Sequence, residues 1–170
     1  MSSPDIVIQQ ADPAEPGVRA LIRALDAHQQ ALYPDESNHL DEIETLQKSN
    51  VYLVAASLPN GTQVIGCGAI KFLQEPCADE DSSGMRRYGE IKRVFVAEPY
   101  RGKGVSGAIM AALEQYAGQQ GINLLRLETG IYQPEAIGFY EKLGYRHCGA
   151  FGEYSAQDPY SVFMEKMLDS

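Results

Sequence analysis

Cysteine and histidine, which often build metal or covalent sites, are scarce in this chain. Its 170 residues include three of each, and neither occurs at the spacing of a metal site. Cys67, Cys77 and Cys148 are far apart, so we expect free thiols in a reducing cytoplasm. None belongs to a motif that supplies a plausible histidine base, so no covalent acyl-enzyme is expected.

The chain also lacks long apolar segments and an excess of basic charge. No segment is long enough to span a bilayer, and the beginning, MSSPDIVIQQ, shows no signal-peptide pattern, which predicts a soluble cytoplasmic protein without a membrane partner. Fourteen basic and 23 acidic residues give a net charge of −9, so nucleic acid is not expected as a partner. The acidic excess favours a cationic partner only if the acids converge on a cleft.

Hydrophobic periodicity predicts one α+β domain over residues 1–170, a length that can bury a sizeable core. The dipeptide Asn60-Gly61 predicts a hairpin, and the acidic segment from Gln74 to Tyr88 is expected to be a mobile connection. Helices are expected over Glu15–Leu32, Leu40–Gln47, Val105 to a stop at Gly121, and Pro134–Leu143. Strands are expected over Asp5–Gln10, Val51–Ser57, Gln63–Phe72, Glu90–Val96, Ile122–Leu127, Tyr145–Cys148 and Tyr160–Met167.

The stretch from Glu90 to Gly130 combines a strand, a basic glycine turn, a helix and a second strand. Pro99 ends the first strand, and Val105 begins a helix with a regular apolar face. A glycine-rich turn at a helix start presents unpaired backbone N–H groups and the positive end of the helix dipole. This stretch therefore predicts an anion site, and phosphate is the anion that it favours.

Two nucleotide-binding motifs compete for this glycine turn. Residues 102–107 match G-x-G-x-x-G, and Glu128 follows about twenty residues later, as in a dinucleotide site. However, a dinucleotide site has its first glycine directly after the strand, whereas five residues separate Val96 from Gly102 here. A hairpin also precedes the stretch, and the roughly forty residues after Glu128 are too few to complete a doubly wound sheet. A dinucleotide site stays an alternative, whereas a Walker loop is disfavoured because no Gly-Lys precedes Ser or Thr.

Two motifs resemble the GNAT superfamily of acyl-CoA-dependent N-acetyltransferases. Its pyrophosphate motif, Q/R-x-x-G-x-G/A, matches Arg101 and Gly104, with Ser106 at its last position. Its N-x-x-A-x-x-x-Y-x-x-x-G-F/Y signature resembles residues 133–145, where Gln133 replaces asparagine. The resemblance implies a GNAT-like fold: antiparallel N-terminal strands, a central parallel β-α-β crossover and a splayed sheet.

The resemblance also implies acetyl-CoA as cosubstrate and no metal. The pantetheine arm would contact the backbone of the strand before the glycine turn, and the turn amides would hold the pyrophosphate. Two basic side chains would add charge near the phosphates. The implied acetyl-CoA residues are Val94, Phe95, Val96, Arg101, Gly102, Lys103, Gly104, Val105, Ser106 and Gln133.

Glu90 and Tyr140 are the implied catalytic residues. The family often uses a glutamate near this strand position as general base, and a tyrosine on the later helix to protonate the coenzyme A thiolate. Strict alternation along the strand predicts that Glu90 and Lys92 share a face with Val94 and Val96. Whether Glu90 would act directly or through water is left open.

The resemblance implies an acceptor pocket built from residues 33–39 and from the loop before the last strand. Acidic side chains there would attract a cationic amine, and aromatic rings would pack against its carbon skeleton. The implied substrate-binding residues are Tyr33, Glu36, Phe151, Glu153 and Tyr154.

The leading hypothesis is an N-acetyltransferase that acetylates a primary amine of a small metabolite by direct attack, with a cationic metabolite as one option. A non-catalytic acyl-CoA-binding regulatory module of the same fold is one alternative, and an NAD(P)-binding oxidoreductase is another. The identity of the amine, a peptide N-terminus as acceptor, and homodimer formation through edge strands are left open.

Overall fold

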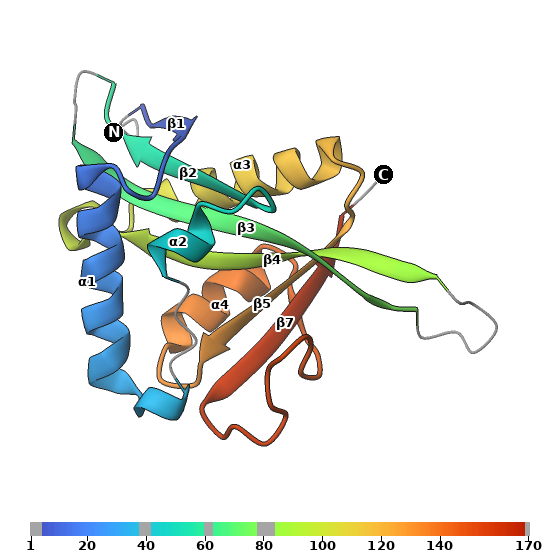
Figure 1. Ribbon diagram of the computed structural model, residues 1–170. Helices are drawn as coiled ribbons and strands as arrows, with labels where there is room; N and C mark the ends of the chain where they lie inside the picture. Colours follow the sequence, from blue (N-terminus) through green and yellow to red (C-terminus); the bar gives the residue numbers. More distant parts are fainter. Residues whose placement is uncertain (1–4, 38–41, 60–62, 78–83, 169–170) are drawn as a thin grey trace.

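The computed structural model of the protein describes residues 5–37, 42–59, 63–77 and 84–168. Within these ranges the strands form one mixed sheet in the order β1-β2-β3-β4-β5-β7-β6 (Figure 1). The strands are β1 (Val7–Gln10), β2 (Val51–Ser57), β3 (Val64–Pro76), β4 (Met85–Val96), β5 (Leu124–Gly130), β6 (Arg146–His147) and β7 (Ser161–Met167). The helices are α1 (Pro16–Leu32), α2 (Ile43–Leu46), α3 (Val105–Gln119) and α4 (Pro134–Lys142), with 3-10 turns η1 (Asp35–Ser37) and η2 (Glu98–Tyr100).

Helices cover both faces of this sheet. The apolar stripe of α1, which includes Val18 and Ile22, packs on Leu53 and Cys67. Ile109 and Leu113 of α3 belong to the cluster on the other face, together with parts of α4. The predicted amphipathic helices and the α+β class are therefore confirmed. No helix in the described ranges has the length and apolarity needed to cross a membrane.

One parallel pair of strands lies at the centre of the otherwise antiparallel sheet described here. β4 and β5 pair only from Gly89 with Leu125 to Ile91 with Leu127, and they diverge beyond Ile91. The predicted β-α-β crossover and splayed sheet are confirmed. The dinucleotide-binding alternative is wrong, because a doubly wound fold needs successive parallel strands.

A β-bulge interrupts β4 at the point where it leaves β5. Between the pairs Cys67–Phe95 and Ala69–Lys92, β4 has one residue more than β3. Arg93, in this bulge, has a left-handed φ of 59°, and its Nη1 lies 2.6 Å from Oδ1 of Asp26 on α1.

This bulge corrects the alternation predicted for β4. Ile91, Val94 and Val96 all pack in the cluster on the α3 side. Strict alternation would have placed Ile91 opposite the other two residues. The extra residue reverses the side-chain direction along the strand, so Glu90 and Lys92 do not share a face with Val94 and Val96.

The connection predicted between Gln74 and Tyr88 is also wrong in its described parts. β3 continues to Pro76 and pairs there with Met85 at the start of β4, forming a ribbon that projects from the sheet (Figure 1). Such a projecting ribbon has little apolar surface to bury, so its sequence lacks hydrophobic periodicity. The Asn60-Gly61 turn lies outside the described residues, but β2 and β3 are antiparallel as predicted.

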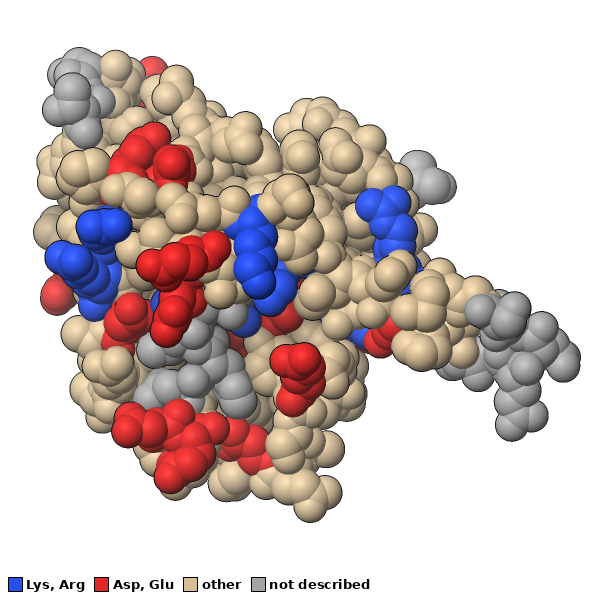
Figure 2. Space-filling model, in the orientation of Figure 1, with Lys and Arg blue, Asp and Glu red and all other residues tan. Residues whose placement is uncertain are grey.

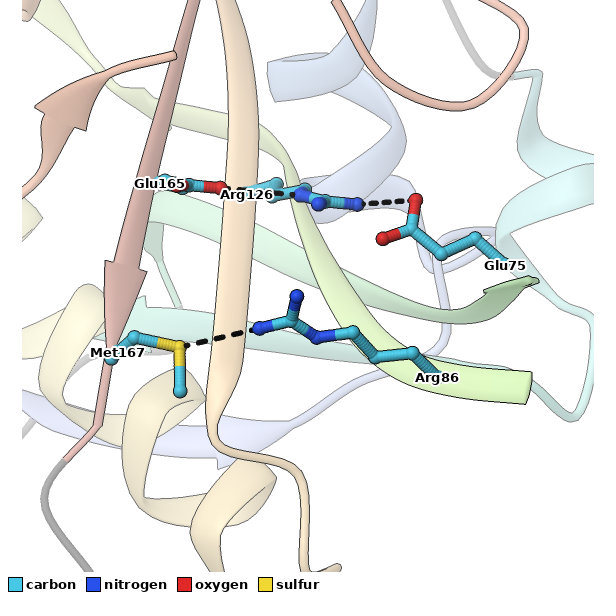
Figure 3. A network of polar contacts seen from close by, with 5 residues as sticks. All are labelled: Glu75, Arg86, Arg126, Glu165 and Met167. Carbon is cyan, nitrogen blue, oxygen red and sulfur yellow. Dashed lines mark hydrogen bonds and ion pairs between the residues drawn. The ribbon is translucent and has the colours of Figure 1, made fainter. Parts of the chain in front are cut away.

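Arg126 of β5 fastens the base of this ribbon (Figure 3). Its Nη1 lies 2.7 Å from Oε2 of Glu75 on β3, and its Nε donates to Oε2 of Glu165 on β7 at 3.5 Å. The guanidinium also stacks 4.7 Å from the ring centre of Tyr88. Burial acts to lower the pKa of Arg126, but Glu75 and Glu165 together raise it by more, so the pKa is raised overall and the charge persists.

We expect Gly68→Ala to lower the free energy of unfolding by about 1–3 kcal/mol, because α3 crosses β3 closely at this glycine. A β-carbon at Gly68 would lie 2.5 Å from Cγ2 of Ile109 and 3.3 Å from Cγ2 of Val94. Urea denaturation measures the change. Gly118→Ala on α3 is the matched control, since a β-carbon there meets nothing within 4 Å and alanine favours the helix. Equal stabilities of the two variants would contradict the close approach of α3 to β3 at Gly68.

Candidate active site

A cleft of about 810 Å³ opens where β4 and β5 diverge. Its walls come from the bulged end of β4, the start of α3, the end of β5, α4, and α1 with the segment after it. This volume suits a substrate or cofactor of moderate size. Within the described ranges, no group of histidine, cysteine, aspartate or glutamate side chains could hold a metal ion.

The glycine turn forms an open cradle of amides at one end of this cleft. Gly102 and Gly104 have left-handed φ angles of 76° and 83°, and Gly104 caps α3 without a side-chain hydrogen bond. A β-carbon at Gly102, Gly104 or Gly107 would meet nothing within 4 Å. The first residues of α3, from Val105 to Gly107, line the cleft, so the unpaired amides and the positive dipole end of this helix start are placed where a diphosphate would fit.

The two basic side chains of the turn lie differently. Arg101 lines the cleft, but its Nε donates to the carbonyl of Val96 at 2.9 Å and its guanidinium stacks 5.2 Å from the ring centre of Phe95. Lys103 lies 6.0 Å from the ring centre of Tyr100 and is not among the lining residues. Arg101 therefore also caps the end of β4, and phosphate contacts by either side chain remain a prediction.

Tyr140 lines the cleft from α4. It is 8% exposed and lies between Phe139 and Tyr145, with ring centres 5.3 and 5.8 Å away. Burial raises the pKa of Tyr140 well above its usual value, so the hydroxyl keeps its proton at neutral pH. Gln133 lines the same wall just before α4, and its Oε1 accepts a hydrogen bond from Gln29 Nε2 at 3.4 Å.

Glu90 lies in the cleft wall and contacts Tyr154 and Lys92. Its side chain accepts a hydrogen bond from the hydroxyl of Tyr154, and the residue is only 4% exposed. Lys92 Nζ donates to the same hydroxyl at 3.1 Å and lies 3.6 Å from Oε2 of Glu90. Tyr154, from the loop before β7, thus joins Glu90 and Lys92 in one polar cluster.

Glu128 is a second carboxylate in the cleft, which we did not predict as a catalytic residue. It follows Leu127, the last residue of β5 that pairs with β4, and its Oε2 accepts a hydrogen bond from Ser161 Oγ at 3.3 Å. Burial raises the pKa of Glu128 to about 7, with Ser161 and Lys92 opposing the rise. In the sequence, Glu128 was notable only for its position after an apolar strand, and we assigned that position to the alternative dinucleotide motif.

Tyrosines form the wall beyond these carboxylates. Tyr33, predicted at the substrate, stacks on Tyr132 with ring centres 5.6 Å apart, and Tyr160 meets both rings. The Tyr33 hydroxyl accepts a hydrogen bond from the backbone N–H of Tyr132 at 3.1 Å. Tyr132 and Tyr160 line the cleft but were not predicted, because turns far apart in sequence bring them there.

The structure does not bring Glu36, Phe151 or Glu153 into the cleft. The two glutamates are exposed outside it. Phe151 is 6% exposed and packs edge-on against Tyr88 and Phe163, so it supports Tyr154 from behind rather than lining the wall. His39, predicted within the acceptor loop, lies outside the described residues.

We expect Gly130→Ala to lower the free energy of unfolding by about 3 kcal/mol, because Tyr33 lies directly across this glycine. A β-carbon at Gly130 would clash with the phenol of Tyr33, which must then move. Thermal denaturation measures the loss. Tyr33→Phe is the control: it removes the hydroxyl that accepts the hydrogen bond from Tyr132 and should cost about 1 kcal/mol. If Gly130→Ala is as stable as the wild type, the position of Tyr33 does not depend on its close approach to Gly130.

Comparison with known proteins agrees with this geometry. A sequence model described as the acetyltransferase (GNAT) family matches residues 18–145. An "IAA acetyltransferase" from Azospirillum brasilense is 39% identical over 97% of this chain and 99% of its own length. An uncharacterized N-acetyltransferase, YsnE, from Bacillus subtilis is 33% identical over 79% of this chain and 82% of its own.

Solved structures share the fold. A candidate acyl-CoA N-acyltransferase from Klebsiella pneumoniae has a TM-score of 0.73 and 36% identity, covering 96% of this chain and 98% of that one. Arabidopsis thaliana NAA60, solved in complex with acetyl-CoA, has a TM-score of 0.65 and 18% identity over 96% of this chain and 98% of its own, a likeness of fold alone.

Proposed function

We propose that this chain, which belongs to the acetyltransferase (GNAT) family, transfers an acetyl group from acetyl-CoA to a primary amine of a small cationic molecule. The observation that carries the proposal is one continuous cleft. It runs from the glycine cradle at Gly104, past Tyr140, to the carboxylates of Glu90 and Glu128. An elongated thioester and an amine could therefore meet between the splayed strands.

The residues of the cleft fit acetyl-CoA, which supplies an activated acetyl group when bound. The amides after Gly104 would hold the diphosphate. Because β5 does not pair with β4 beyond Ile91, the end of β4 from Val94 to Val96 has a free backbone edge for the pantetheine amides. Gln133 would add a side-chain amide from the opposite wall. These contacts would orient the thioester toward Tyr140.

The charge distribution supports a cationic acceptor. Glu90 and Glu128 both line the cleft, with Lys92 as the basic neighbour that they share. Figure 2 shows further acidic side chains gathered on the surface around η1, at the lower part of the molecule. Such a field attracts an ammonium group and repels an anionic acceptor.

Direct attack requires a free amine and a proton for the departing sulfur. Tyr140 is the proposed acid, because its hydroxyl keeps its proton in the buried wall. Glu90, predicted from the sequence as general base, is one of two carboxylates that could receive the ammonium proton. No covalent enzyme intermediate is needed, and Cys67 is buried with its pKa raised to about 12.

An amine-panel assay with acetyl-CoA, followed by release of free thiol, tests this function. We expect turnover with small primary amines that carry a net positive charge, and little with amino acids of net negative charge. Tight acetyl-CoA binding measured by calorimetry without turnover on any amine, including peptide N-termini, would support a non-catalytic acyl-CoA-binding module instead. Turnover confined to anionic amines would contradict the proposed acceptor class.

A further inference from the structure

Two carboxylates face the acceptor end of the cleft from opposite sides of the splay. We propose that Glu128 on β5 binds the acceptor's ammonium and takes its proton, while Glu90 on β4 positions Tyr154 and Lys92. This inference rests on the proposed acetyl transfer. It concerns which group at that site carries the proton, and it differs from the role that the sequence predicted for Glu90.

The strand register places Glu128 at the opening of the cleft. Leu127 is the last residue of β5 that pairs with β4, opposite Ile91, so Glu128 is the first residue beyond the junction. On its other side the backbone of Glu128 pairs with Phe163 of β7, which fixes the strand. The carboxylate is therefore held on a rigid element where an acceptor must pass between the diverging strands.

Contacts around Glu90 suit a positioning residue. Its carboxylate already accepts the Tyr154 hydroxyl and lies 3.6 Å from Lys92 Nζ, and the lysine also donates to that hydroxyl at 3.1 Å. Taking a proton would remove the charge that holds both partners. Glu90 therefore fixes Tyr154, a loop residue, against the rigid sheet and so shapes the acceptor wall.

Groups from several elements set the protonation of Glu128. Lys92 and Glu90 face it from β4, Asp158 from the loop before β7, Tyr33 from the end of α1, and Ser161 donates to it from β7. Burial is the dominant influence and raises the pKa of Glu128 to about 7, with Ser161 and Lys92 acting in the opposite direction. A carboxylate that gains and loses a proton near neutral pH is suited to general base catalysis.

The proton balance of the reaction closes with this assignment. The ammonium gives one proton to Glu128, and the neutral nitrogen attacks the acetyl carbon to form the new C–N bond. As the C–S bond breaks, the Tyr140 hydroxyl protonates the sulfur, and the proton left on the new amide nitrogen restores the tyrosine. Glu128 then releases its proton to water, so one proton leaves per turnover.

The pH dependence of kcat/KM separates the two carboxylates. In the wild type, kcat/KM should rise as the pH increases through about 7, because the base must be unprotonated. In Glu128→Gln this rise of kcat/KM with pH, the limb near pH 7, should be absent, and kcat/KM at pH 8 should be about 10²-fold lower than in the wild type. In Glu90→Gln the limb should remain, and kcat/KM should fall by about tenfold because Tyr154 is less well ordered. The acceptor's own ionisation is the same for every variant.

Glu141→Gln is the matched control, since Glu141 is exposed on α4 outside the cleft lining. Its profile should equal that of the wild type. Acetyl-CoA affinity and melting temperature, measured for each variant, show whether the fold and donor site are intact. A limb near 7 that disappears in Glu90→Gln and persists in Glu128→Gln would overturn the assignment.

Carboxyl resonances give a readout that does not need turnover. In ¹³C NMR of the protein without ligands, the signal absent from Glu128→Gln should titrate near pH 7. Titration of that signal below pH 5 would contradict the inference even if the enzyme is active. Absence of acetyl transfer by the wild type would contradict the proposed function, whereas the NMR titration would still decide the state of Glu128.

Discussion

Tyr140→Phe is expected to lower kcat by about 10²-fold or more, with acetyl-CoA affinity unchanged to within about twofold. The variant removes only the hydroxyl proposed to protonate the sulfur. The ring packs between Phe139 and Tyr145 and keeps those contacts in phenylalanine. Steady-state kinetics with an active amine measure kcat, and calorimetric titration measures acetyl-CoA binding.

Tyr145→Phe is the matched control for this prediction. Tyr145 belongs to the same aromatic cluster, but its hydroxyl donates to Glu114 Oε1 at 3.3 Å and the residue does not line the cleft. Its loss should lower stability by about 1 kcal/mol and leave kcat unchanged. Equal kcat in Tyr140→Phe and the wild type would remove Tyr140 from the mechanism, and another donor would then have to protonate the sulfur.

Local sequence signals predicted the parts of the site that lie within one stretch of chain. The glycine turn before α3 and the helix that carries Tyr140 each depend on neighbouring residues, and the structure has both where they were expected. Turn chemistry and helix periodicity act over a few residues, so they can be read directly from the sequence.

Features that depend on strand register were not predictable in the same way. The bulge at Arg93 exists because β4 has one residue more than β3 over the same span, and the positive φ of an arginine is held by Asp26 on a distant helix. Nothing in the local pattern of β4 distinguishes this strand from a regular one. The alternation prediction therefore failed at the residue where the cleft begins.

The acceptor wall shows the same limit at longer range. Tyr33, Tyr132 and Tyr160 lie on three separate segments and come together only in the folded structure. Phe151 and Glu153 looked equivalent to Tyr154 in sequence, but only Tyr154 reaches Glu90. Loop side chains obey no fixed period, so which of them faces a cleft is decided by tertiary contacts.

The second large effect is expected from Gly104→Asp compared with Gly104→Asn. Both side chains tolerate the left-handed φ of 83° better than other residues do, and both are favoured at a helix N-cap. They have nearly the same shape and differ in charge. The comparison therefore isolates the electrostatic role of the cradle from its backbone geometry.

Gly104→Asp should bind acetyl-CoA about 100-fold more weakly than Gly104→Asn. Two unit charges about 6 Å apart at an effective dielectric constant of about 20 repel by about 3 kcal/mol, and the aspartate would face the diphosphate at that range. Calorimetry measures the two affinities. Because an N-cap carboxylate also favours the helix dipole, the aspartate variant should be at least as stable as the asparagine variant.

A donor without phosphates separates this repulsion from damage to the rest of the cleft. S-acetyl-N-acetylcysteamine keeps the thioester and one amide but lacks the diphosphate, so both variants should use it with equal kcat/KM. Acetyl-CoA affinities that are equal in the two variants would place the diphosphate away from the start of α3. If Gly104→Asp is impaired with acetyl-CoA but not with the phosphate-free donor, the diphosphate lies at the glycine turn, because only there would the added carboxylate repel the negative charge of the diphosphate.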